Sequence, residues 1–428
     1  MKFYSTRDSR KQLFSVQDAA FLGLAPDGGL FVPERIPQVD MARVAALAKV
    51  SYADMACYLA QQIFDDIPAA TVEEVVRGAY DFAPEMHRFE ERKAALELFH
   101  GPTFAFKDFG ARFMGRMAGK LNSSENLTIL TATSGDTGSA VAAGFYNVEG
   151  VDVVILYPDG KVSPLQEAQM TTLGGNIHPL RVRGNFDDCQ RLVKEMFSDA
   201  DLRGRKRITS ANSINLLRWI PQSFYYFYGW CLYRDMTGCE APDIVVPSGN
   251  YGNITAGMLA AKMGMPVRRF VAASNANDVV PEYLRTGVYT PRASVRTVAN
   301  AMDVGAPSNY ERMMWLYGSL EALRADVSGF ACSDAEILRA IAEIERKYGY
   351  VSDPHSAVGY LAAQHYDIDG FWLSTASCAK FSEVIQQATG HGAEIPPALA
   401  SLLQKERVYQ MMDATPAALK EYLLECRV

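Results

Sequence analysis

Short apolar stretches alternate with helix-like segments from about residue 96 onward, and this alternation constrains the fold more than any other feature of the sequence. Strands that are separated by helices pair in parallel, because the chain needs a crossover to return to the same edge of a sheet. The candidate strands are residues 127–133, 152–157, 177–182, 243–247, 267–273 and 371–375. The pattern therefore predicts an α/β fold with a parallel sheet.

Capping residues mark helix starts between these strands. Ser163-Pro164-Leu165-Gln166 and Ser333-Asp334-Ala335-Glu336 each place a hydroxyl at the first position and a Gln or Glu three residues later. The two side chains of such a pair bond to the unpaired N–H groups of the first helical turn. Thr415-Pro416 is also typical of a helix start. These signals support the alternation of strands and helices.

The first eighty or so residues have a different pattern. Two helix-like stretches, around residues 44–50 and 53–64, follow a turn-rich segment at residues 25–33. We interpret residues 1–85 as an accessory unit that covers a main body formed by residues 86–428. With 428 residues, 49% of them apolar, the chain can bury a large core divided into two or three structural units.

Charge and hydropathy exclude several classes of protein. The formal net charge is −7, and the longest basic run is Arg203-Gly204-Arg205-Lys206-Arg207, so we expect no nucleic-acid partner. The longest apolar stretches are far short of the roughly 20 residues of a membrane helix, so we expect no membrane span. The charged N-terminus lacks the apolar core of a signal peptide, which predicts a cytoplasmic protein.

Cysteine and histidine spacing argues against a metal site. No Cys-x-x-Cys or His-Glu-x-x-His spacing occurs, so we expect no metal and no disulfide framework. The seven cysteines are typical of reduced thiols. They are Cys57, Cys189, Cys231, Cys239, Cys332, Cys378 and Cys426.

Two predicted strands end in glycine-containing loops that precede helices. One is Ser134-Gly135-Asp136-Thr137-Gly138, and the other is Ser248-Gly249-Asn250-Tyr251-Gly252-Asn253. Glycine lets backbone N–H groups converge, and the helix N-terminus adds positive potential, so each loop can bind an anion. The alternatives are a tight turn without a ligand in the second loop and simple helix capping by Ser134 and Asp136 in the first. Two such loops in one chain favour two anionic groups.

A lysine with aromatic neighbours completes the candidate chemistry. Lys107 lies among Phe104, Phe106 and Phe109, and apolar surroundings lower the pKa of an ammonium group. The neutral amine that results can form a Schiff base. The alternative is a lysine at a helix start that extends its ammonium to solvent. Together with two anion-binding loops, Lys107 becomes the candidate for holding pyridoxal phosphate.

Three motifs in this chain resemble those of the threonine synthase family. They are His100-Gly101-Pro102-Thr103-Phe104-Ala105-Phe106-Lys107-Asp108, the segment 131–138 and the segment 247–253. The resemblance runs in order from residues 2–7 through 28–33 to Thr375-Ala376 and Lys380-Phe381, and so covers essentially the whole chain. It is to the bacterial and fungal type, because plant-type members carry an N-terminal extension for S-adenosylmethionine that has no counterpart here.

The resemblance implies a fold and an activity. The fold is that of type II pyridoxal-phosphate enzymes, similar to the tryptophan synthase β-subunit, with two twisted-sheet subdomains and the accessory unit. A smaller mobile subdomain at about residues 108–205 is expected to close over the site. The implied reaction converts O-phospho-L-homoserine and water to L-threonine and phosphate, with pyridoxal phosphate as cofactor. We expect a monomer or a homodimer.

The resemblance also implies roles for individual residues. Lys107 matches the catalytic Schiff-base lysine, Thr375 the hydroxyl at the pyridine nitrogen, and Asp136 a group near the phenolic oxygen of the cofactor. The cofactor phosphate is assigned to Gly249, Asn250, Tyr251, Gly252 and Asn253, and the substrate carboxylate to Ser134, Gly135 and Thr137.

The substrate phosphate is the least constrained assignment. A dianionic leaving group needs cations and hydrogen-bond donors, and the candidates are Lys161, Ser213, Asn215 and Arg218. Lys161 has the alternative of a solvated turn residue, Ser213 that of a helix cap, and Arg218 that of a surface ion-pair member.

Two departures from the family pattern leave these roles in place. Ser377-Cys378 stands where many relatives have His-Pro, and Tyr251 where Phe is common.

Two other functions remain open on sequence grounds. One is a pyridoxal-phosphate-dependent phospholyase or dehydratase that acts on a phosphorylated or hydroxylated amino acid. The other is a metabolite-binding protein of the same fold without catalytic activity.

Overall fold

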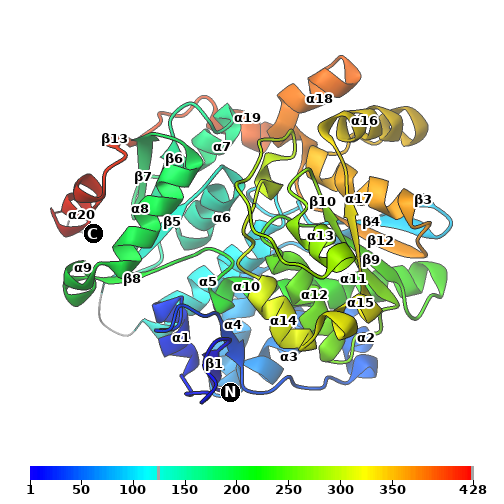
Figure 1. Ribbon diagram of the computed structural model, residues 1–428, viewed down its shortest axis with the longest axis horizontal. Helices are drawn as coiled ribbons and strands as arrows, with labels where there is room; N and C mark the ends of the chain where they lie inside the picture. The colour runs from blue at the N-terminus through cyan, green and yellow to red at the C-terminus, as the bar shows by residue number, and fades with distance from the viewer. Residues whose placement is uncertain (123–125, 426–428) are drawn as a thin grey trace.

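A five-stranded sheet forms one side of the molecule (Figure 1). The structure, a computed structural model, describes residues 1–122 and 126–425. The strand order is β13-β7-β6-β5-β8, and every pair is parallel. The strands are β5 (Leu127–Ala132), β6 (Val151–Pro158), β7 (Ile177–Arg183), β8 (Arg207–Thr209) and β13 (Gln410–Asp413). The helices of this part are α5 (Lys107–Leu121), α6 (Asp136–Phe145), α7 (Pro164–Thr171), α8 (Phe186–Ser198), α9 (Ala200–Arg205) and α20 (Pro416–Glu425).

A six-stranded sheet forms the other side (Figure 1). Its order is β11-β10-β9-β12-β4-β3, and only the pair β3–β4 is antiparallel. The strands are β3 (Glu85–Glu90), β4 (Lys93–Glu97), β9 (Asp243–Pro247), β10 (Arg269–Ser274), β11 (Val327–Ala331) and β12 (Gly370–Ser374). The helices are α10 (Leu216–Trp219), α11 (Gln222–Thr237), α12 (Gly252–Lys262), α13 (Val279–Thr286), α14 (Tyr310–Tyr317), α15 (Leu320–Asp326), α16 (Asp334–Tyr348), α17 (Pro354–His365) and α18 (Ser382–Thr389), with short 3-10 helices η1 (Asn300–Met302) and η2 (Cys378–Phe381). Helix α19 (Pro397–Leu402) packs on α7 of the five-stranded-sheet part.

All six predicted strands are present, and three of them position the loops of interest. Every residue of β5, β9 and β12 is buried, because helices cover both faces of a parallel sheet. The capping boxes at Ser163 and Ser333 form as predicted, and α20 begins at Pro416. Strand β13 lies far along the chain from the predicted smaller subdomain at about residues 108–205, and β8 follows directly after that range. Both strands are short, so their sequences do not show that they belong to the five-stranded sheet.

The N-terminal residues form a separate layer of structure at the base of both sheets (Figure 1). A two-stranded sheet, β1 (Phe3–Ser5) and β2 (Phe31–Pro33), is followed by α2 (Met41–Ala48), α3 (Tyr52–Ile63) and α4 (Ala69–Ala79), with α1 (Val16–Leu22) between the strands. Helix α4 packs on α5, α3 on α11, and α1 on β8. The layer therefore contacts elements that belong to both large sheets.

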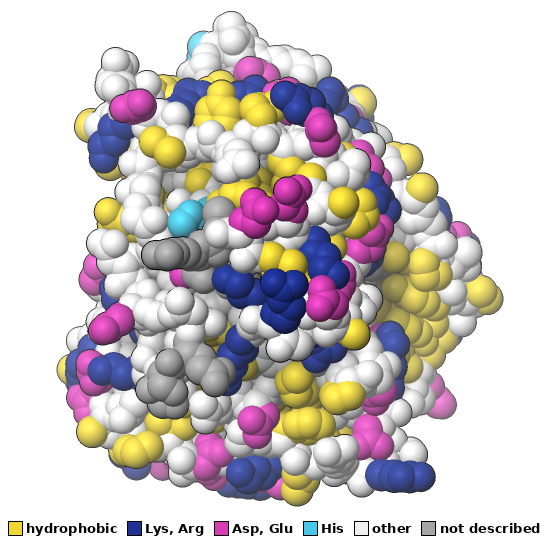
Figure 2. All heavy atoms as spheres, turned by 90° about the vertical axis from the view of Figure 1, so that its left-hand side faces the viewer, with side chains coloured by type: hydrophobic (Ala, Val, Ile, Leu, Met, Phe, Trp, Pro, Cys, Tyr) yellow, Lys and Arg dark blue, Asp and Glu magenta, His cyan; other side chains and the backbone are white. Residues whose placement is uncertain are grey.

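The surface carries charges of both signs. Figure 2, which views the side that carries α8 and α20, shows Lys and Arg side chains next to Asp and Glu. Lys420 pairs with Asp199 at 2.8 Å, and Arg191 with Glu195 at 3.0 Å. Within residues 1–122 and 126–425, no helix is long and apolar enough to cross a membrane. The described cysteines are free, and Cys426 lies outside the described residues.

Helices α5 and α6 cross at a pair of glycines. A Cβ atom added to Gly115 would overlap the carbonyl oxygen of Gly144, and one added to Gly144 would lie 2.7 Å from the carbonyl carbon of Ala111. A Cβ on Gly110 would lie 2.5 Å from the carbonyl oxygen of Arg218 in α10. Backbone contacts of this kind cannot relax by side-chain rotation. They hold α5, which begins with Lys107, in a defined position.

We expect Gly115→Ala to lower the free energy of unfolding by about 1–3 kcal/mol, because the added methyl group meets backbone. Gly204→Ala in α9 is the matched control, since nothing lies within 4 Å of a Cβ there. Its stability should stay unchanged or rise by up to about 1 kcal/mol. Urea unfolding followed by circular dichroism measures both variants, and equal changes would contradict the proposed role of the crossing.

Candidate active site

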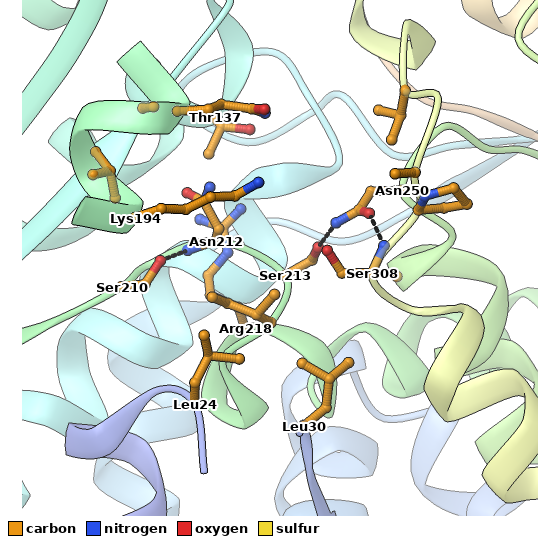
Figure 3. A pocket seen from close by; sticks show the side chains of 18 of the residues that line it. Leu24, Leu30, Thr137, Lys194, Ser210, Asn212, Ser213, Arg218, Asn250 and Ser308 are labelled. Carbon is orange, nitrogen blue, oxygen red and sulfur yellow. Dashed lines mark hydrogen bonds between the residues drawn. The ribbon is translucent and has the colours of Figure 1, made fainter. Parts of the chain in front are cut away.

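A cavity of about 1600 Å³ opens between the two large sheets. It is lined by residues after β5, after β9 and after β12, because the carboxyl ends of these strands point toward the same space. Lys107 at the start of α5 faces this cavity, and Leu24 and Leu30 of the N-terminal layer close it from below (Figure 3). The structure thus brings the predicted lysine, both predicted loops and Thr375 together.

Lys107 lies in a mixed environment and not in a purely apolar wall. Its Nζ is 5.8 Å from the centroid of the Phe106 ring and 3.8 Å from Oδ2 of Asp136. Phe109 instead packs into an aromatic cluster with Phe82 and other rings. Burial lowers the pKa of Lys107 to about 8, although the carboxylate of Asp136 opposes this shift. The predicted low pKa is therefore present, with burial as its cause.

The loop after β5 presents a buried carboxylate to the cavity. Gly135 adopts φ +143, and a Cβ there would overlap the side chain of Gln166, so the position needs glycine. The hydroxyl of Thr133 accepts hydrogen bonds from the N–H groups of Gly135 and Gly138 at 2.9 and 2.8 Å. Thr133 therefore caps this turn, which leaves Ser134, Asp136 and Thr137 to line the cavity.

Asp136 is the centre of a buried charge cluster. Its Oδ1 accepts from Nζ of Lys380 at 2.6 Å and from Nε2 of Gln166 at 3.0 Å. Burial alone would raise the pKa of Asp136, but the charges of Lys380 and Lys107 outweigh it and hold the pKa well below its usual range. Asp136 is therefore a carboxylate at neutral pH.

The loop after β9 forms a cradle at the N-terminus of α12, a helix of 11 residues. A Cβ on Gly249 would lie 2.6 Å from Cα of Met302, and one on Gly252 would lie 2.9 Å from Cβ of Ser213. Tyr251 takes the left-handed conformation at φ 59, and its hydroxyl is hydrogen-bonded to Ser274. All of residues 249–253 line the cavity. Backbone N–H groups at a helix start suit a phosphate, so the residues present fit the predicted cofactor.

Ser213 joins this cradle to the segment before α10. Its hydroxyl accepts hydrogen bonds from Nδ2 of Asn250 at 2.8 Å and from Nδ2 of Asn309 at 3.1 Å. The N–H of Ser308 donates to Oδ1 of Asn250 at 2.6 Å, as Figure 3 shows. The two predicted phosphate-binding segments are therefore in direct contact.

Arg218 is buried and points into the cavity (Figure 3). Its Nε and Nη1 have no hydrogen-bond partner among the residues that the structure describes. Burial lowers the pKa of Arg218 to about 10, so the group stays charged at neutral pH. Arg218 is thus not a surface ion-pair member but a buried cation that lines the cavity, and two of its donor atoms have no partner among the described residues.

The structure does not place Lys161, Asn215 and Gly135 with the cavity-lining residues. Lys161 is exposed in the turn after β6. Asn215 turns away from the cavity: its Nδ2 donates to the carbonyl oxygen of Ala20 at 2.7 Å, and its Oδ1 caps α10. We had expected both side chains to bind the substrate phosphate, and their positions correct that expectation. Gly135 is buried behind Ser134 and contributes the shape of the turn.

Family comparisons agree with this geometry. A family model for "Pyridoxal-phosphate dependent enzyme" matches residues 94–370, "Threonine synthase N terminus" matches residues 2–80, and "Threonine synthase, C-terminal" matches residues 356–423. The threonine synthase of Escherichia coli strain K12 is 40% identical over 428 residues, which cover 99% of both chains. The chain belongs to the threonine synthase family.

Solved threonine synthase structures share the whole architecture. The crystal structure of the Escherichia coli protein superposes with a TM-score of 0.91 at 38% identity and covers 99% of both chains. The pyridoxal-phosphate-bound threonine synthase of Brucella melitensis gives a TM-score of 0.93 at 33% identity over 100% of both chains. The predicted family, type II fold and pyridoxal phosphate cofactor are confirmed.

Several residues in or next to the cavity of this family member were not predicted as site residues from the sequence. Gln166 and Lys380 contact Asp136, and Lys194 of α8 extends toward Asn212 and Thr137 (Figure 3). His355 at the start of α17 accepts from the N–H of Ala301 at 3.1 Å through Nε2. Gln166 occurs in a capping box and His355 follows a capping Asp353, so the sequence already explains both residues by helix capping and does not indicate that they lie near the cavity. Lys380 follows Thr375 in the quoted motif, which is the one sequence signal that was available.

A second cluster of potential ligands lies outside the cavity. Ligand atoms of Glu85, Glu97 and His100 lie within 4.8 Å of one another at the β3–β4 edge. Nε2 of His100 is 2.9 Å from Glu97, and this hydrogen bond raises the pKa of His100. The contact between His100 and Glu97 explains why these side chains lie together, so we propose no metal site here.

Arg312 of α14 holds the Ser213 loop from behind. Its guanidinium donates to the carbonyl oxygens of Ser213 at 2.6 Å and Ile214 at 2.7 Å and to Oδ1 of Asn309 at 2.8 Å. The same group packs over the ring of Trp219 at 4.2 Å. Burial lowers the pKa of Arg312 to about 9. This buried cation therefore holds the loop and Asn309 in fixed positions relative to each other.

We expect Arg312→Leu to lower the free energy of unfolding by about 3 kcal/mol, because several buried carbonyl groups lose their donor. Arg285→Leu is the control, since that side chain is 74% exposed, and its effect should stay within about 0.5 kcal/mol. Urea unfolding compares the two. A similar loss in both variants would show that Arg312 does not hold the loop.

Proposed function

We propose that the protein is a threonine synthase, which converts O-phospho-L-homoserine and water to L-threonine and phosphate. The observation that carries this proposal is the meeting of Lys107, two anion-binding loops and the unpaired donors of Arg218 in one cavity. Full-length similarity to the threonine synthase of Escherichia coli supports the same reaction. A phospholyase would use the same buried cation for its phosphate, so the similarity to a threonine synthase and the reaction products separate these two functions.

The cofactor would be held by residues at three strand ends. Nζ of Lys107 would bind its aldehyde carbon, residues 249–253 its phosphate, and Asp136 would face its phenolic oxygen. The hydroxyl of Thr375 would meet the ring nitrogen; a neutral partner there keeps the ring a milder electron sink than a carboxylate would. When bound, the cofactor supplies an electron sink that stabilises negative charge on substrate carbons.

The substrate would be held at its two anionic ends. Ser134, Thr137 and the N-terminus of α6, a helix of 10 residues, suit the α-carboxylate. Arg218 and Ser213 suit the phosphate, which gains negative charge at its bridging oxygen as it departs. The carboxylate would thus be bound on the five-stranded-sheet side, and the phosphate by α10 and the segment before it.

Lys107 would also move protons. An amine whose pKa is about 8 is partly neutral near neutral pH, so Nζ can accept the α-proton of a bound substrate and return it later. The hydrophobic side chains of Leu24 and Leu30 limit the water that reaches this space, while one water must enter to be added.

Further properties follow from the same proposal. We divide the chain near residue 85, because α4 ends at Ala79 and β3 begins the main sheet at Glu85. We also propose that the α5–α9 part, about residues 108–205, moves to close the cavity. Free thiols support a cytoplasmic, reducing location, and we propose a monomer or homodimer.

Product analysis tests the proposed reaction. Purified holoenzyme with O-phospho-L-homoserine should release threonine and phosphate in equal amounts. A phospholyase would release 2-oxobutyrate, ammonia and phosphate without threonine, and a binding protein would release nothing. Either of these outcomes would replace the proposed function.

We expect Lys107→Ala to abolish both threonine formation and the visible absorbance of the covalent link between protein and cofactor. The control is Lys405→Ala on the surface, which should keep both. Absorbance spectra of the two purified proteins after incubation with pyridoxal phosphate decide the matter. Retained covalent absorbance in Lys107→Ala would assign the cofactor to another amine.

We expect Arg218→Gln to lower kcat/KM for O-phospho-L-homoserine about 10- to 100-fold, because a charged hydrogen bond to the phosphate is lost. Lys161→Gln should change kcat/KM less than about twofold, because Lys161 is exposed outside the cavity. Steady-state phosphate release measures both variants. Comparable losses would place the substrate phosphate nearer Lys161.

A further inference from the structure

Lys380 is a fully buried cation beside the proposed cofactor lysine. The exposed fraction of its side chain is 0%, and its Nζ donates to Oδ1 of Asp136 at 2.6 Å and to the carbonyl oxygen of Thr103 at 2.9 Å. It lies on η2, directly after the Thr375 segment. Substrate and cofactor contacts are already supplied by other side chains, so this second buried lysine needs a different explanation.

Asp136 links the two lysines through different oxygens. Oδ1 pairs with Lys380 at 2.6 Å, whereas Oδ2 lies 3.8 Å from Nζ of Lys107. If both lysines were protonated, one carboxylate would face two buried ammonium groups, and the cluster would carry an uncompensated positive charge. Buried net charge is costly, so the loss of one proton stabilises the cluster.

Geometry indicates which lysine loses the proton. Lys380 has two strong acceptors and no exposure, whereas Lys107 has one distant carboxylate oxygen. Each acceptor stabilises an ammonium group, so the site of Lys380 is the better one for a positive charge. The titratable and charged groups that face this pair are Asp136 of α6, Asp108 of α5, Arg218 of α10 and His355 of α17, and even with Asp108 ionised the two lysines and Arg218 outnumber the two carboxylates. Arg218 adds a second positive charge that also disfavours a proton on Lys107.

We propose that Lys380 is a positioning residue that holds Asp136 in place as a carboxylate and keeps Lys107 a neutral amine, ready to bond the cofactor. This inference rests on the proposed role of Lys107. Removal of the Lys380 charge leaves Lys107 as the sole lysine partner of Asp136 in the cluster, so Lys107 should then retain its proton to higher pH. Removal of the Asp136 charge leaves Lys380 uncompensated, so Lys107 should lose its proton at lower pH.

The rate at which the full-length apoprotein forms its covalent link with added pyridoxal phosphate reports on the neutral amine. We would follow this rate by absorbance as a function of pH, after checking each variant's fold by circular dichroism. Lys380→Met should move the midpoint of the profile up by at least about one pH unit, and Asp136→Asn should move it down. Lys380→Arg retains the charge and should restore a midpoint close to that of the unmodified protein. Lys405 is exposed, so Lys405→Met is the matched control and should leave the midpoint unchanged.

Opposite shifts in the two charge-removing variants support the proposal, because structural damage would slow the reaction at every pH without moving the midpoint. An unchanged midpoint in folded Lys380→Met would overturn it. If that variant does not fold, an unchanged or raised midpoint in Asp136→Asn overturns it equally. Lys107→Ala distinguishes this failure from that of the proposed function: covalent absorbance in that variant removes the role of Lys107, whatever the profiles show.

Discussion

The structure around the cavity depends on one buried carboxylate between two lysines. The ammonium group of Lys380 at 2.6 Å stabilises the charge of Asp136 inside the protein, and the cluster needs three segments to converge. Asp136 begins α6, Lys107 begins α5, and Lys380 lies on η2 after β12. The cluster therefore ties the five-stranded sheet to the six-stranded sheet at the point where the chemistry is proposed.

The fold satisfies this constraint through strand ends and close backbone packing. Parallel strands direct β5, β9 and β12 toward one space, and helix N-termini follow two of them. The glycine crossing of α5 and α6 fixes the distance between Lys107 and the Asp136 loop. Arg312 performs a comparable task for the Ser213 loop, and its bond to the carbonyl oxygen of Phe31 at 3.2 Å connects that loop to the N-terminal layer. The accessory layer thus supports the site as well as covering it.

The unusual Ser377-Cys378 pair has a defined place in this arrangement. The hydroxyl of Ser377 accepts from the N–H of Ala379 and so caps η2, the short helix that presents Lys380. Cys378 is partly buried, and burial raises the pKa of its thiol to about 11, which leaves it unreactive near neutral pH. Ser377 therefore caps the short helix that places Lys380 next to Asp136.

The sequence predicts the α/β class, the six strands and the two loops, because alternating apolar segments and glycine-rich turns are local patterns. It also identified Lys107, whose motif is continuous along the chain. The packing of the elements places Arg218 in the cavity lining with two unpaired donor atoms, while Asn215 caps α10 and Lys161 stays exposed. The packing alone joins Lys380 to Asp136, which lie far apart in the sequence. Side-chain direction and long-range ion pairing depend on how elements pack, and no local pattern records that packing.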